Sequence, residues 1–335
     1  METVLVTGGA GYLGYHVVSK LLANGYKIRI LDNLSFGDNA LQILKKKHKF
    51  DLIKGDIRDL RTVLKSMEDI DSIIHLAGIV GDPASKIDTI VSTEINYLST
   101  KLVVDAASYF QINKFIFAST CSVYGASDSN LLNESSKINP VSLYAETKLK
   151  SENIILNSLS KKVTPVIFRT GTLFGLSERM RFDLVINLFV GQALTEHKIM
   201  IEGGDQWRPF VHVEDAANAY LLALQQQKSK IHGIFNLGGN ELNYQLKDIA
   251  KFICQEIPNT QISHSKINDR RNYRVSFNKI KKSLGFEPHR TISYGINEIK
   301  NAIISKKIQS WKNSIYYNNK FPLVGKNKNS EYYWQ

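Results

Sequence analysis

The sequence predicts an α/β protein with a Rossmann-type, doubly wound parallel sheet and a smaller C-terminal α/β lobe. Three observations predict it. Over the first 170 residues, short β-branched runs alternate with longer helical periods, a glycine-rich turn follows the first run, and the rhythm changes after Gly171. Such alternation is typical of βαβ units whose sheet is covered on both faces. The 335 residues are enough for one large domain with a smaller lobe.

The individual elements follow from the spacing of apolar residues. Six β-branched runs predict strands at residues 4–6, 27–31, 50–53, 72–75, 114–117 and 164–168. Helical spacing between them predicts helices at 12–23, 60–67, 87–110 and 141–159. Beyond Gly171 the pattern predicts helices at 182–193, 213–226, 242–256 and 278–283, short strands at 198–201 and 208–212, and an irregular segment at 263–273.

This pattern divides the chain into two parts without a low-complexity linker. Residues 1–172 form the Rossmann domain, and we expect 213–237 to return to it. Residues 173–212 and 238–305 form the smaller lobe, and 306–335 are a C-terminal tail rich in Asn, Lys and aromatic residues. The composition of the tail leaves open whether it wraps the body, contacts a partner subunit or is partly disordered.

Composition and charge narrow the class of protein. There is no apolar run of about 20 residues that would span a membrane, and the N-terminus lacks the pattern of a secretory signal. Two cysteines, Cys121 and Cys254, form neither a disulfide framework nor a metal cluster. The net charge of +12 comes largely from short lysine runs, which are typical of solvated helix faces. We therefore expect a soluble cytoplasmic protein without a membrane, metal or nucleic-acid partner.

A dinucleotide site is predicted at the end of the first strand. Gly8 permits a tight turn, Gly11 lets the backbone approach a pyrophosphate, and Gly14 allows close packing of helix and strand. Asp32 ends the second strand, where a carboxylate binds both ribose hydroxyls and repels a 2′-phosphate, so NAD is favoured over NADP. Asp56 is expected to meet the adenine. The other predicted cofactor-binding residues are Tyr12, Leu13, Asn33, Ile57, Leu76 and Ala77.

A second group of residues has the pattern of an acid–base site. Tyr144 and Lys148 are four residues apart in a predicted helix, which places both side chains on one face. An ammonium near a phenol favours the phenolate, so Tyr144 is the candidate general base. Thr120 follows the fifth strand at the carboxyl edge of the sheet, where its hydroxyl can hold the oxygen that Tyr144 deprotonates. Lys148 and Tyr144 are also expected to contact the cofactor.

With these residues the sequence resembles an extended short-chain dehydrogenase/reductase of the NAD-dependent nucleotide-sugar epimerase/dehydratase family. The resemblance spans about residues 1–290 and rests on Thr7–Gly14, Asp32, His75–Ala77, Thr120–Gly125, Tyr144, Lys148 and the run 208–215. It implies tightly held NAD, hydride transfer at a sugar carbon, usually C4, and a substrate with a nucleoside-diphosphate group. It also implies catalytic roles for Thr120, Tyr144 and Lys148, and a substrate-binding role for the smaller lobe.

The resemblance also assigns candidate substrate residues. Thr172, Asn187 and Arg208 match positions that hold the diphosphate or nucleotide in relatives, and Lys266 and Arg271 lie in the region that closes over the nucleotide. Val80 and Ser122 complete the set. Arg179 and Arg181 lie in an unusual stretch, and the sequence leaves open whether they are surface cations or ligand-binding groups.

Two departures from the family narrow the activity. Cys121 and Ser122 stand where dehydrating relatives carry an Asp-Glu or Ser-Glu pair, which disfavours a 4,6-dehydratase. The loop 79–85 lacks the lysine-bearing pattern of ordinary UDP-galactose epimerases, so the sugar stays open. We expect a C4 epimerase that acts on a nucleoside-diphosphate sugar. The alternatives are a 4-dehydrogenase or 4-keto-sugar reductase of the same family, or a non-catalytic NAD-binding sensor. A homodimer through the helices at 87–110 and 141–159 is implied by the resemblance.

Overall fold

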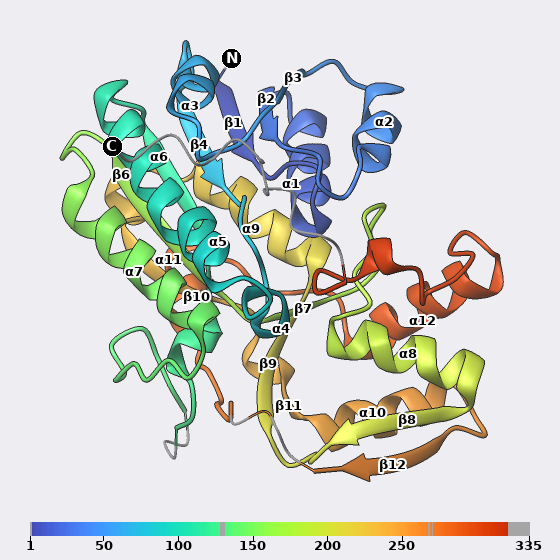
Figure 1. The fold of residues 1–335 in the computed structure, drawn as a ribbon. Coiled ribbons are helices and arrows are strands. Elements are labelled where there is room, and N and C mark those ends of the chain that lie inside the picture. The colour runs from blue at the N-terminus through green and yellow to red at the C-terminus, as the bar shows by residue number, and fades with distance from the viewer. Residues whose placement is uncertain (1, 128–130, 267–268, 270, 321–335) are drawn as a thin grey trace.

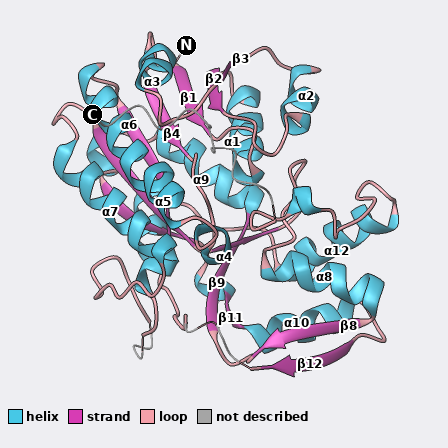
Figure 2. Ribbon diagram, in the orientation of Figure 1, coloured by secondary structure: helices cyan, strands magenta, loops and turns pink. Residues whose placement is uncertain are grey.

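The computed structural model describes residues 2–127, 131–266, 269 and 271–320. Its largest element is a seven-stranded sheet with the order β10-β6-β5-β4-β1-β2-β3, in which every neighbouring pair is parallel (Figures 1 and 2). The strands are β1 (Thr3–Thr7), β2 (Lys27–Asp32), β3 (Asp51–Lys54), β4 (Ser72–His75), β5 (Lys114–Thr120), β6 (Thr164–Thr170) and β10 (Gly233–Leu237). The predicted doubly wound fold class is confirmed.

Helices cover both faces of this sheet because successive strand residues point to opposite sides. Val4 and Val6 of β1 pack into one apolar core, whereas Leu5 between them packs into another. The first core lies under α1 (Tyr12–Ala23), α2 (Asn39–Lys45), α9 (Val213–Gln225) and α11 (Asn278–Leu284). The second lies under α3 (Leu60–Met67), α6 (Ser99–Tyr109) and α7 (Leu143–Ser158), and Figure 1 shows α6 and α7 side by side on the near face.

The long helix predicted at 87–110 is divided in the structure. Its parts are α5 (Thr89–Thr93), the π-helical turn η1 (Glu94–Leu98) and α6, and the short helix α4 (Asp82–Ser85) precedes them. The π-helical turn contains Asn96, whose buried amide bonds the backbone N–H and C=O of Ile79 at 2.8 and 2.9 Å. A π turn shifts the side chains of a helix out of regular register. Here it fixes the loop after β4, and apolar spacing alone does not reveal it.

The smaller lobe is built around two short sheets and three helices. The strand order is β11-β9-β7 in one sheet and β12-β8 in the other. The strands are β7 (Thr172–Phe174), β8 (Lys198–Glu202), β9 (Trp207–His212), β11 (Asn243–Gln245) and β12 (Gln261–Ser265); the helices are α8 (Val185–Glu196), α10 (Leu246–Glu256) and α12 (Ile292–Ile304). Short helical turns occur at η2 (Cys121–Tyr124), η3 (Lys228–Lys230), η4 (Asn240–Leu242) and η5 (Ser314–Tyr316).

Most predicted elements of the first 170 residues are present within a few residues of their expected bounds. Several elements were not predicted, among them α2, α12, β7, β10 and β12, and β12 occupies the start of the segment expected to be irregular. Segment 213–237 contributes α9, which packs on α1, and β10, which pairs with β6 at the edge of the main sheet. The tail packs on the smaller lobe as far as residue 320, with Trp311 and Tyr317 in its apolar core. Residues 321–335 lie outside the described part of the chain.

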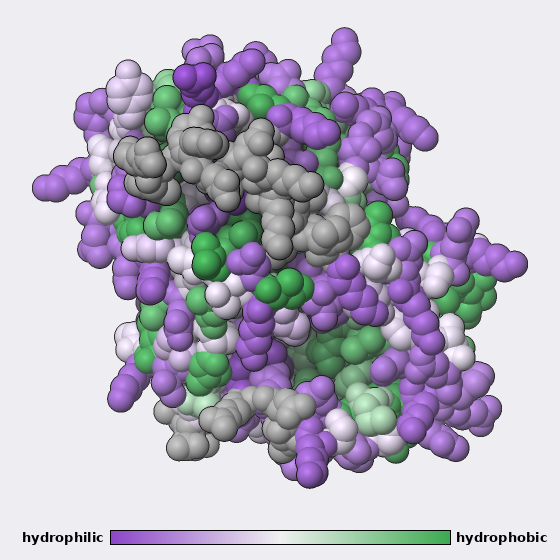
Figure 3. Space-filling model, in the orientation of Figure 1, coloured by the Kyte–Doolittle hydropathy of each residue, from purple (hydrophilic) through white to green (hydrophobic). Residues whose placement is uncertain are grey.

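Much of the visible surface is hydrophilic outside the grey residues, and hydrophobic residues gather in a hollow near the lower centre of the view (Figure 3). The lysine runs at 45–47, 161–162, 281–282 and 306–307 are exposed, as their interpretation as solvated faces requires. In the described ranges, helices with the length and apolar character of a membrane span are absent.

Candidate active site

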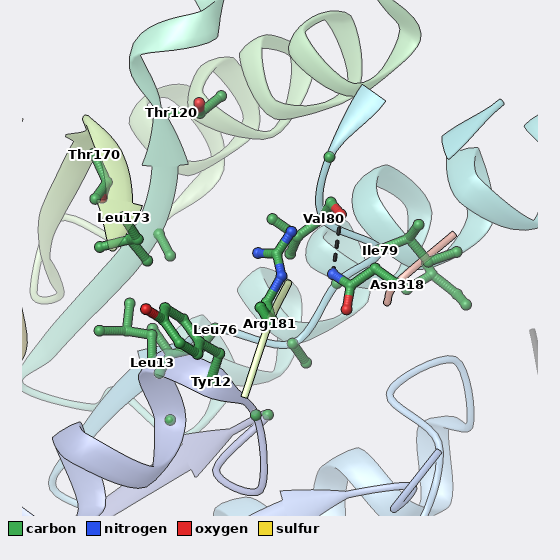
Figure 4. Close-up of a pocket in the computed structure, with 18 of the residues that line it drawn as sticks. Tyr12, Leu13, Leu76, Ile79, Val80, Thr120, Thr170, Leu173, Arg181 and Asn318 are labelled. Carbon is green, nitrogen blue, oxygen red and sulfur yellow. Dashed lines mark hydrogen bonds between the residues drawn. The ribbon is translucent and has the colours of Figure 1, made fainter. Parts of the chain in front are cut away.

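A deep pocket opens at the carboxyl ends of the main strands and extends under the smaller lobe (Figure 4). This edge is where open parallel sheets bind ligands. Most residues predicted for the site line the pocket: Gly8, Gly11, Tyr12, Leu13, Gly14, Asp32, Asn33, Asp56, Ile57, Leu76, Ala77, Val80, Thr120, Ser122, Tyr144, Lys148, Thr172 and Arg271. Asn187, Arg208 and Lys266 are not among its lining residues in the described chain.

The glycine turn leaves the N-terminus of α1 open to this pocket. A Cβ on Gly14 would lie 2.1 Å from the backbone oxygen of Gly8, and one on Gly8 would lie 2.7 Å from the nitrogen of Ala77. Gly8 also has a φ of +75°, which a residue with a side chain rarely adopts. Gly11 precedes the helix without a side-chain cap, so the first backbone N–H groups of α1 are available to a phosphate.

The carboxylate of Asp32 lies beside this turn at the end of β2. It accepts hydrogen bonds from the N–H of Ala10 at 3.0 Å and the N–H of Leu34 at 2.8 Å. Burial nevertheless raises the pKa of Asp32 above its ordinary value. The two backbone donors hold the carboxylate in place, and each of its oxygens keeps a lone pair for a ribose hydroxyl.

The adenine end of the predicted site is already hydrogen-bonded to its neighbours. Asp56 forms an ion pair with Arg58 at 2.7 Å, and Arg58 also contacts Glu94 at 3.0 Å. Asn33 accepts hydrogen bonds from the backbone and side chain of Ser35 at 3.0 and 2.7 Å. Both residues line the pocket, so contact with a base requires their remaining lone pairs.

Tyr144 and Thr120 both line the pocket. Tyr144 lies in the first turn of α7, and Thr120 ends β5. Burial raises the pKa of Tyr144, whereas the charge of Arg181 and the hydroxyl of Thr120 lower it. The structure thus brings a phenol and a hydroxyl to one pocket, and their shared contact with a sugar hydroxyl stays a prediction.

Lys148 lies one turn further along the same helix. Its ammonium donates a hydrogen bond to the carbonyl of Ala118 at 2.9 Å and lies 4.6 Å from the ring centre of Phe117. Burial lowers the pKa of Lys148 to about 8. The charge of Arg181 lowers the pKa of the Tyr144 phenol, and the influence of Lys148 on this phenol stays a prediction.

A buried ion pair fixes α7 against the sheet. Arg169 on β6 and Glu152 on α7 are each 1% exposed in their side chains and lie 2.7 Å apart. Glu152 also accepts a hydrogen bond from the hydroxyl of Ser119, next to Thr120 on β5. Buried pairs of this kind are sensitive to the loss of one partner. The network sets the position of Tyr144 and Lys148 relative to Thr120.

Arg181 enters the pocket from the smaller lobe. Figure 4 shows its side chain reaching into the middle of the cavity beside Val80. It pairs with Asp183 through bonds of 3.1 and 2.8 Å, and the pair is nearly buried. Arg179 lines the same pocket from the same stretch. Both arginines were considered from the sequence, where their proximity in an unusual segment was the available signal.

The substrate side is closed by ion pairs between the two parts of the chain. Arg271 contacts Asp82 of the larger part at 3.0 Å and Asp269 at 2.6 Å. Asp82 in turn accepts a 2.6 Å hydrogen bond from Ser142, the N-cap of α7. Arg208 pairs with Asp269 at 2.9 Å and also bonds the carbonyl of Arg271. Arg208 therefore supports the position of Arg271 from behind the pocket wall.

Two other predicted substrate residues lie away from the pocket wall. Asn187 is fully buried and donates to the carbonyl of Arg181 at 2.8 Å, while its oxygen accepts from the N–H of Gly175 at 3.1 Å. It therefore fixes the backbone that carries Arg181. Lys266 is exposed just after β12. Asp82, Tyr273 and Asn318 also belong to the site or its border; Asp82 and Tyr273 lie in segments that the sequence predicts for the pocket, whereas Asn318 does not.

Comparison with known proteins identifies the family. Residues 4–238 match the model of the NAD dependent epimerase/dehydratase family. The chain belongs to this family. Members of the epimerase/dehydratase family are NAD-dependent enzymes, so this chain is an enzyme with NAD as its cofactor.

Relatives with known names include both activities of the family. A putative UDP-glucose 4-epimerase of Methanocaldococcus jannaschii is 31% identical over 306 residues, which cover 89% of this chain and 97% of the relative. A dTDP-D-glucose 4,6-dehydratase of Mus musculus is 30% identical over 341 residues, which cover 96% and 94%. The structure of UDP-glucuronic acid 4-epimerase from Bacillus cereus, in complex with UDP-glucuronic acid and NAD, is 26% identical with a TM-score of 0.82 and covers 90% and 99%.

The residues of the pocket fit a bound NAD. The open N-terminus of α1 suits the diphosphate, and a side chain on Gly8 or Gly14 would close the turn that provides it. Asp32 suits the adenosine ribose, since its carboxylate is held by backbone donors at the mouth of the turn. The fit rests on backbone geometry and on one half-buried carboxylate.

Proposed function

We propose that this enzyme is a nucleotide-sugar 4-epimerase with Tyr144 as general base. One observation carries the proposal: the side chains of Tyr144 and Thr120 line the pocket that fits NAD, and the hydroxyl of Thr120 lowers the pKa of the Tyr144 phenol. NAD, when bound, supplies the chemistry of accepting a hydride from a sugar carbon and returning it. The residues of this chain then have to bind the sugar, move one hydroxyl proton and allow the sugar to turn.

The proton at the C4 hydroxyl is assigned to Tyr144. Thr120 accepts or donates a hydrogen bond to the same sugar oxygen, and this orients the hydroxyl toward the phenol. Burial raises the pKa of Tyr144, so proton removal depends on nearby positive charge. Arg181 supplies such charge in the structure, and Lys148, with a pKa lowered to about 8, is still mostly protonated at pH 7. The same phenol returns the proton at the end of the cycle.

The residues after Thr120 support epimerisation over dehydration. Loss of water needs an acid and a base near C5 and C6 of the sugar. Cys121 instead donates its thiol to the carbonyl of Arg169 at 3.1 Å, and burial raises the pKa of Cys121. Ser122 lies 3.4 Å from the hydroxyl of Tyr273 and has no ionisable group. Neither side chain is suited to the elimination step.

The nucleotide sugar is assigned to the end of the pocket under the smaller lobe. Arg181, Arg271 and Thr172 line this end, and the two guanidinium groups suit the diphosphate of the substrate. The loop after β4 contributes Val80 to the pocket lining, and its Asp82 forms the ion pair with Arg271. These contacts support a nucleoside-diphosphate sugar as substrate, and they leave the base and the sugar open.

We also propose that the enzyme is a homodimer through the face formed by α5, α6 and α7. Large apolar side chains are exposed on these helices and on the turn η1 between α5 and α6: Ile90 at 71%, Leu98 at 51%, Tyr109 at 77% and Leu156 at 39%. Figure 3 shows green groups on this side of the molecule. Sedimentation velocity is expected to give a dimer, and Ile90→Glu is expected to shift it toward the monomer. A monomer at all concentrations of the parent protein contradicts the assembly.

One experiment tests the proposed function. The purified enzyme is denatured to identify the released nucleotide, and the native enzyme is incubated with UDP-, GDP-, CDP- and dTDP-sugars in deuterated buffer. NMR follows the sugar while absorbance follows reduced cofactor. A new stereoisomer without net reduction supports the proposal. Accumulated reduced cofactor or a keto-sugar identifies a dehydrogenase or reductase, loss of water identifies a dehydratase, and bound NAD without turnover supports a sensor.

A further inference from the structure

Arg179 is a buried cation at the cofactor end of the pocket. The residue is 7% exposed, and its guanidinium lies 3.8 Å from the ring centre of Phe36. One nitrogen donates to the side-chain oxygen of Asn318 at 2.6 Å. Its buried Nε has no hydrogen-bond partner among the described residues. A buried guanidinium with an unused donor is costly unless a ligand accepts from it.

The charged groups around Arg179 indicate which kind of ligand is missing. Arg181 and Arg271 each have a carboxylate within 3.0 Å, whereas Arg179 has none within 4.0 Å in the described chain. Burial lowers the pKa of Arg179 to about 9, and the positive charge of the neighbouring Arg181 adds to this effect. Asp183 and Asp32 act on it only through space. An anion with several oxygen acceptors satisfies both the charge and the free Nε–H.

The position of Arg179 assigns this anion to the cofactor. Phe36, against which it packs, lies in the loop after β2, four residues beyond Asp32. Tyr12, at the start of α1, lines the same pocket as Arg179. Arg179 therefore shares the pocket with Asp32 and with the N-terminus of α1, where the diphosphate of a dinucleotide belongs.

Asn318 connects this arginine to the opposite wall of the pocket. Its amide nitrogen donates to the carbonyl of Val80 at 3.1 Å, the contact drawn in Figure 4, while its oxygen accepts from Arg179. The N–H of Phe182 donates to the carbonyl of Tyr316 at 2.9 Å, and Tyr317 is buried in the smaller lobe. The chain from Trp311 to Asn318 thus runs from the core of the smaller lobe to the loop after β4.

We propose that Arg179 binds the diphosphate of NAD and that Asn318 is a positioning residue that holds Arg179 over the cofactor. The C-terminal segment then acts as a strap that slows the release of NAD. This inference deepens the proposed epimerase, because that reaction needs the same cofactor molecule in both half-reactions. A diphosphate is also present in the nucleotide sugar, and the experiment separates the two sources.

The test measures cofactor retention without any substrate. NAD bound per protein is determined after heat release, and its dissociation rate is measured by a chase with excess labelled NAD. Arg179→Met is expected to release NAD at least tenfold faster, from the loss of hydrogen bonds to a charged group of ~1.5–3 kcal/mol. Asn318→Ala is expected to give a severalfold increase. Asn319→Ala, the exposed neighbour on the same segment, is the matched control and is expected to behave as the parent enzyme.

Two further measurements keep the result interpretable. Circular dichroism and thermal unfolding show whether each variant folds, and Arg179→Lys, which keeps the charge but loses the forked donors, is expected to fall between parent and Arg179→Met. Wild-type retention of NAD by folded Arg179→Met overturns the inference. A drop in UDP affinity of the NAD-loaded enzyme with unchanged NAD release also overturns it, because the arginine then serves the nucleotide sugar. Failure of the parent enzyme to epimerise sugars leaves the NAD release rates unaffected, so the two proposals fail separately.

Discussion

The two ends of the pocket are constructed in different ways. The cofactor end is a backbone structure, in which seven consecutive residues from Gly8 to Gly14 and one carboxylate on the adjacent strand form the cradle. The substrate end is formed by side chains from distant segments, held by ion pairs such as Arg271 with Asp82. The cofactor end therefore restricts which residues fit at a few consecutive positions. The substrate end depends instead on which distant segments the fold brings together.

The largest effect is expected where the two ends meet. Tyr144→Phe removes the proton acceptor but keeps the ring, so turnover is expected to fall about 10²- to 10⁴-fold while NAD retention stays at the parent level. Tyr294→Phe, at an exposed position on α12, is the matched control. Steady-state kinetics and released NAD measure both variants. Retained turnover in Tyr144→Phe contradicts the assignment of the base.

An added side chain in the glycine turn is expected to abolish NAD binding. Gly14→Ala places a methyl group 2.1 Å from the backbone oxygen of Gly8, so the turn must shift, at a cost of about 1–3 kcal/mol in unfolding free energy. We expect the purified variant to carry little NAD. Gly25→Ala adds a methyl at a positive φ with no atom within 4 Å, and it controls for backbone strain alone. Equal NAD content in both variants contradicts a steric cradle.

Lys148 is expected to make the free energy of unfolding depend on pH. Burial lowers its pKa from 10.5 to about 8, so the unfolded chain holds this proton more tightly than the folded chain. The free energy of unfolding of NAD-free protein is therefore expected to rise between about pH 8 and pH 10.5, by up to ~3 kcal/mol. Denaturant titrations across this window measure the rise. Lys148→Met is expected to lose it, and exposed Lys150→Met to keep it; a rise in both variants excludes Lys148 as the source.

Asp32 controls which dinucleotide the cofactor end accepts. Asp32→Ala removes a charged acceptor, and NAD is expected to bind about 10- to 100-fold more weakly. The loss of negative charge is also expected to relax the discrimination against NADP. Isothermal titration of NAD-free protein with each dinucleotide measures both effects, with exposed Asp51→Ala as the control. An unchanged preference for NAD means that another group reads the ribose.

The smallest expected effect is on the KM for the nucleotide sugar, and it distinguishes residues that line the pocket from residues that do not. Arg271→Ala is expected to raise the KM for the nucleotide sugar about tenfold or more, because a guanidinium that lines the pocket is lost. Lys266→Ala is expected to change it less than about twofold, because Lys266 is exposed after β12 and is not part of the pocket wall. Similar effects of the two substitutions contradict the placement of the substrate end.

This contrast also explains what the sequence could predict. The six N-terminal strands, the glycine turn and the pocket positions of Asp32, Thr120, Tyr144 and Lys148 follow from local patterns, because each pattern reflects a steric or periodic requirement. The π turn at Asn96 was hidden, since its cause is a hydrogen bond to the distant loop at Ile79. The spacing of residues along the sequence does not indicate a contact of this kind.

The substrate end was less predictable for the same physical reason. Asn187 and Arg208 are close to the site, but their side chains support Arg181 and Arg271 from behind the pocket wall. Which arginine faces the cavity depends on ion-pair partners elsewhere in the chain, such as Asp82 and Asp183. Asn318 lies in a tail whose composition gave no indication of a pocket contact. Its role depends on the packing of Tyr317 into the smaller lobe.

The most direct test of the account follows a label at the sugar carbon. The nucleotide sugar found in the substrate screen is prepared with deuterium at C4 and incubated with the enzyme beside an unlabelled nucleotide sugar of the same kind. Because both half-reactions are assigned to one closed pocket, NMR and mass spectrometry are expected to find the new stereoisomer with its deuterium still at C4. Exchange of the label between molecules or its appearance in free cofactor contradicts the account.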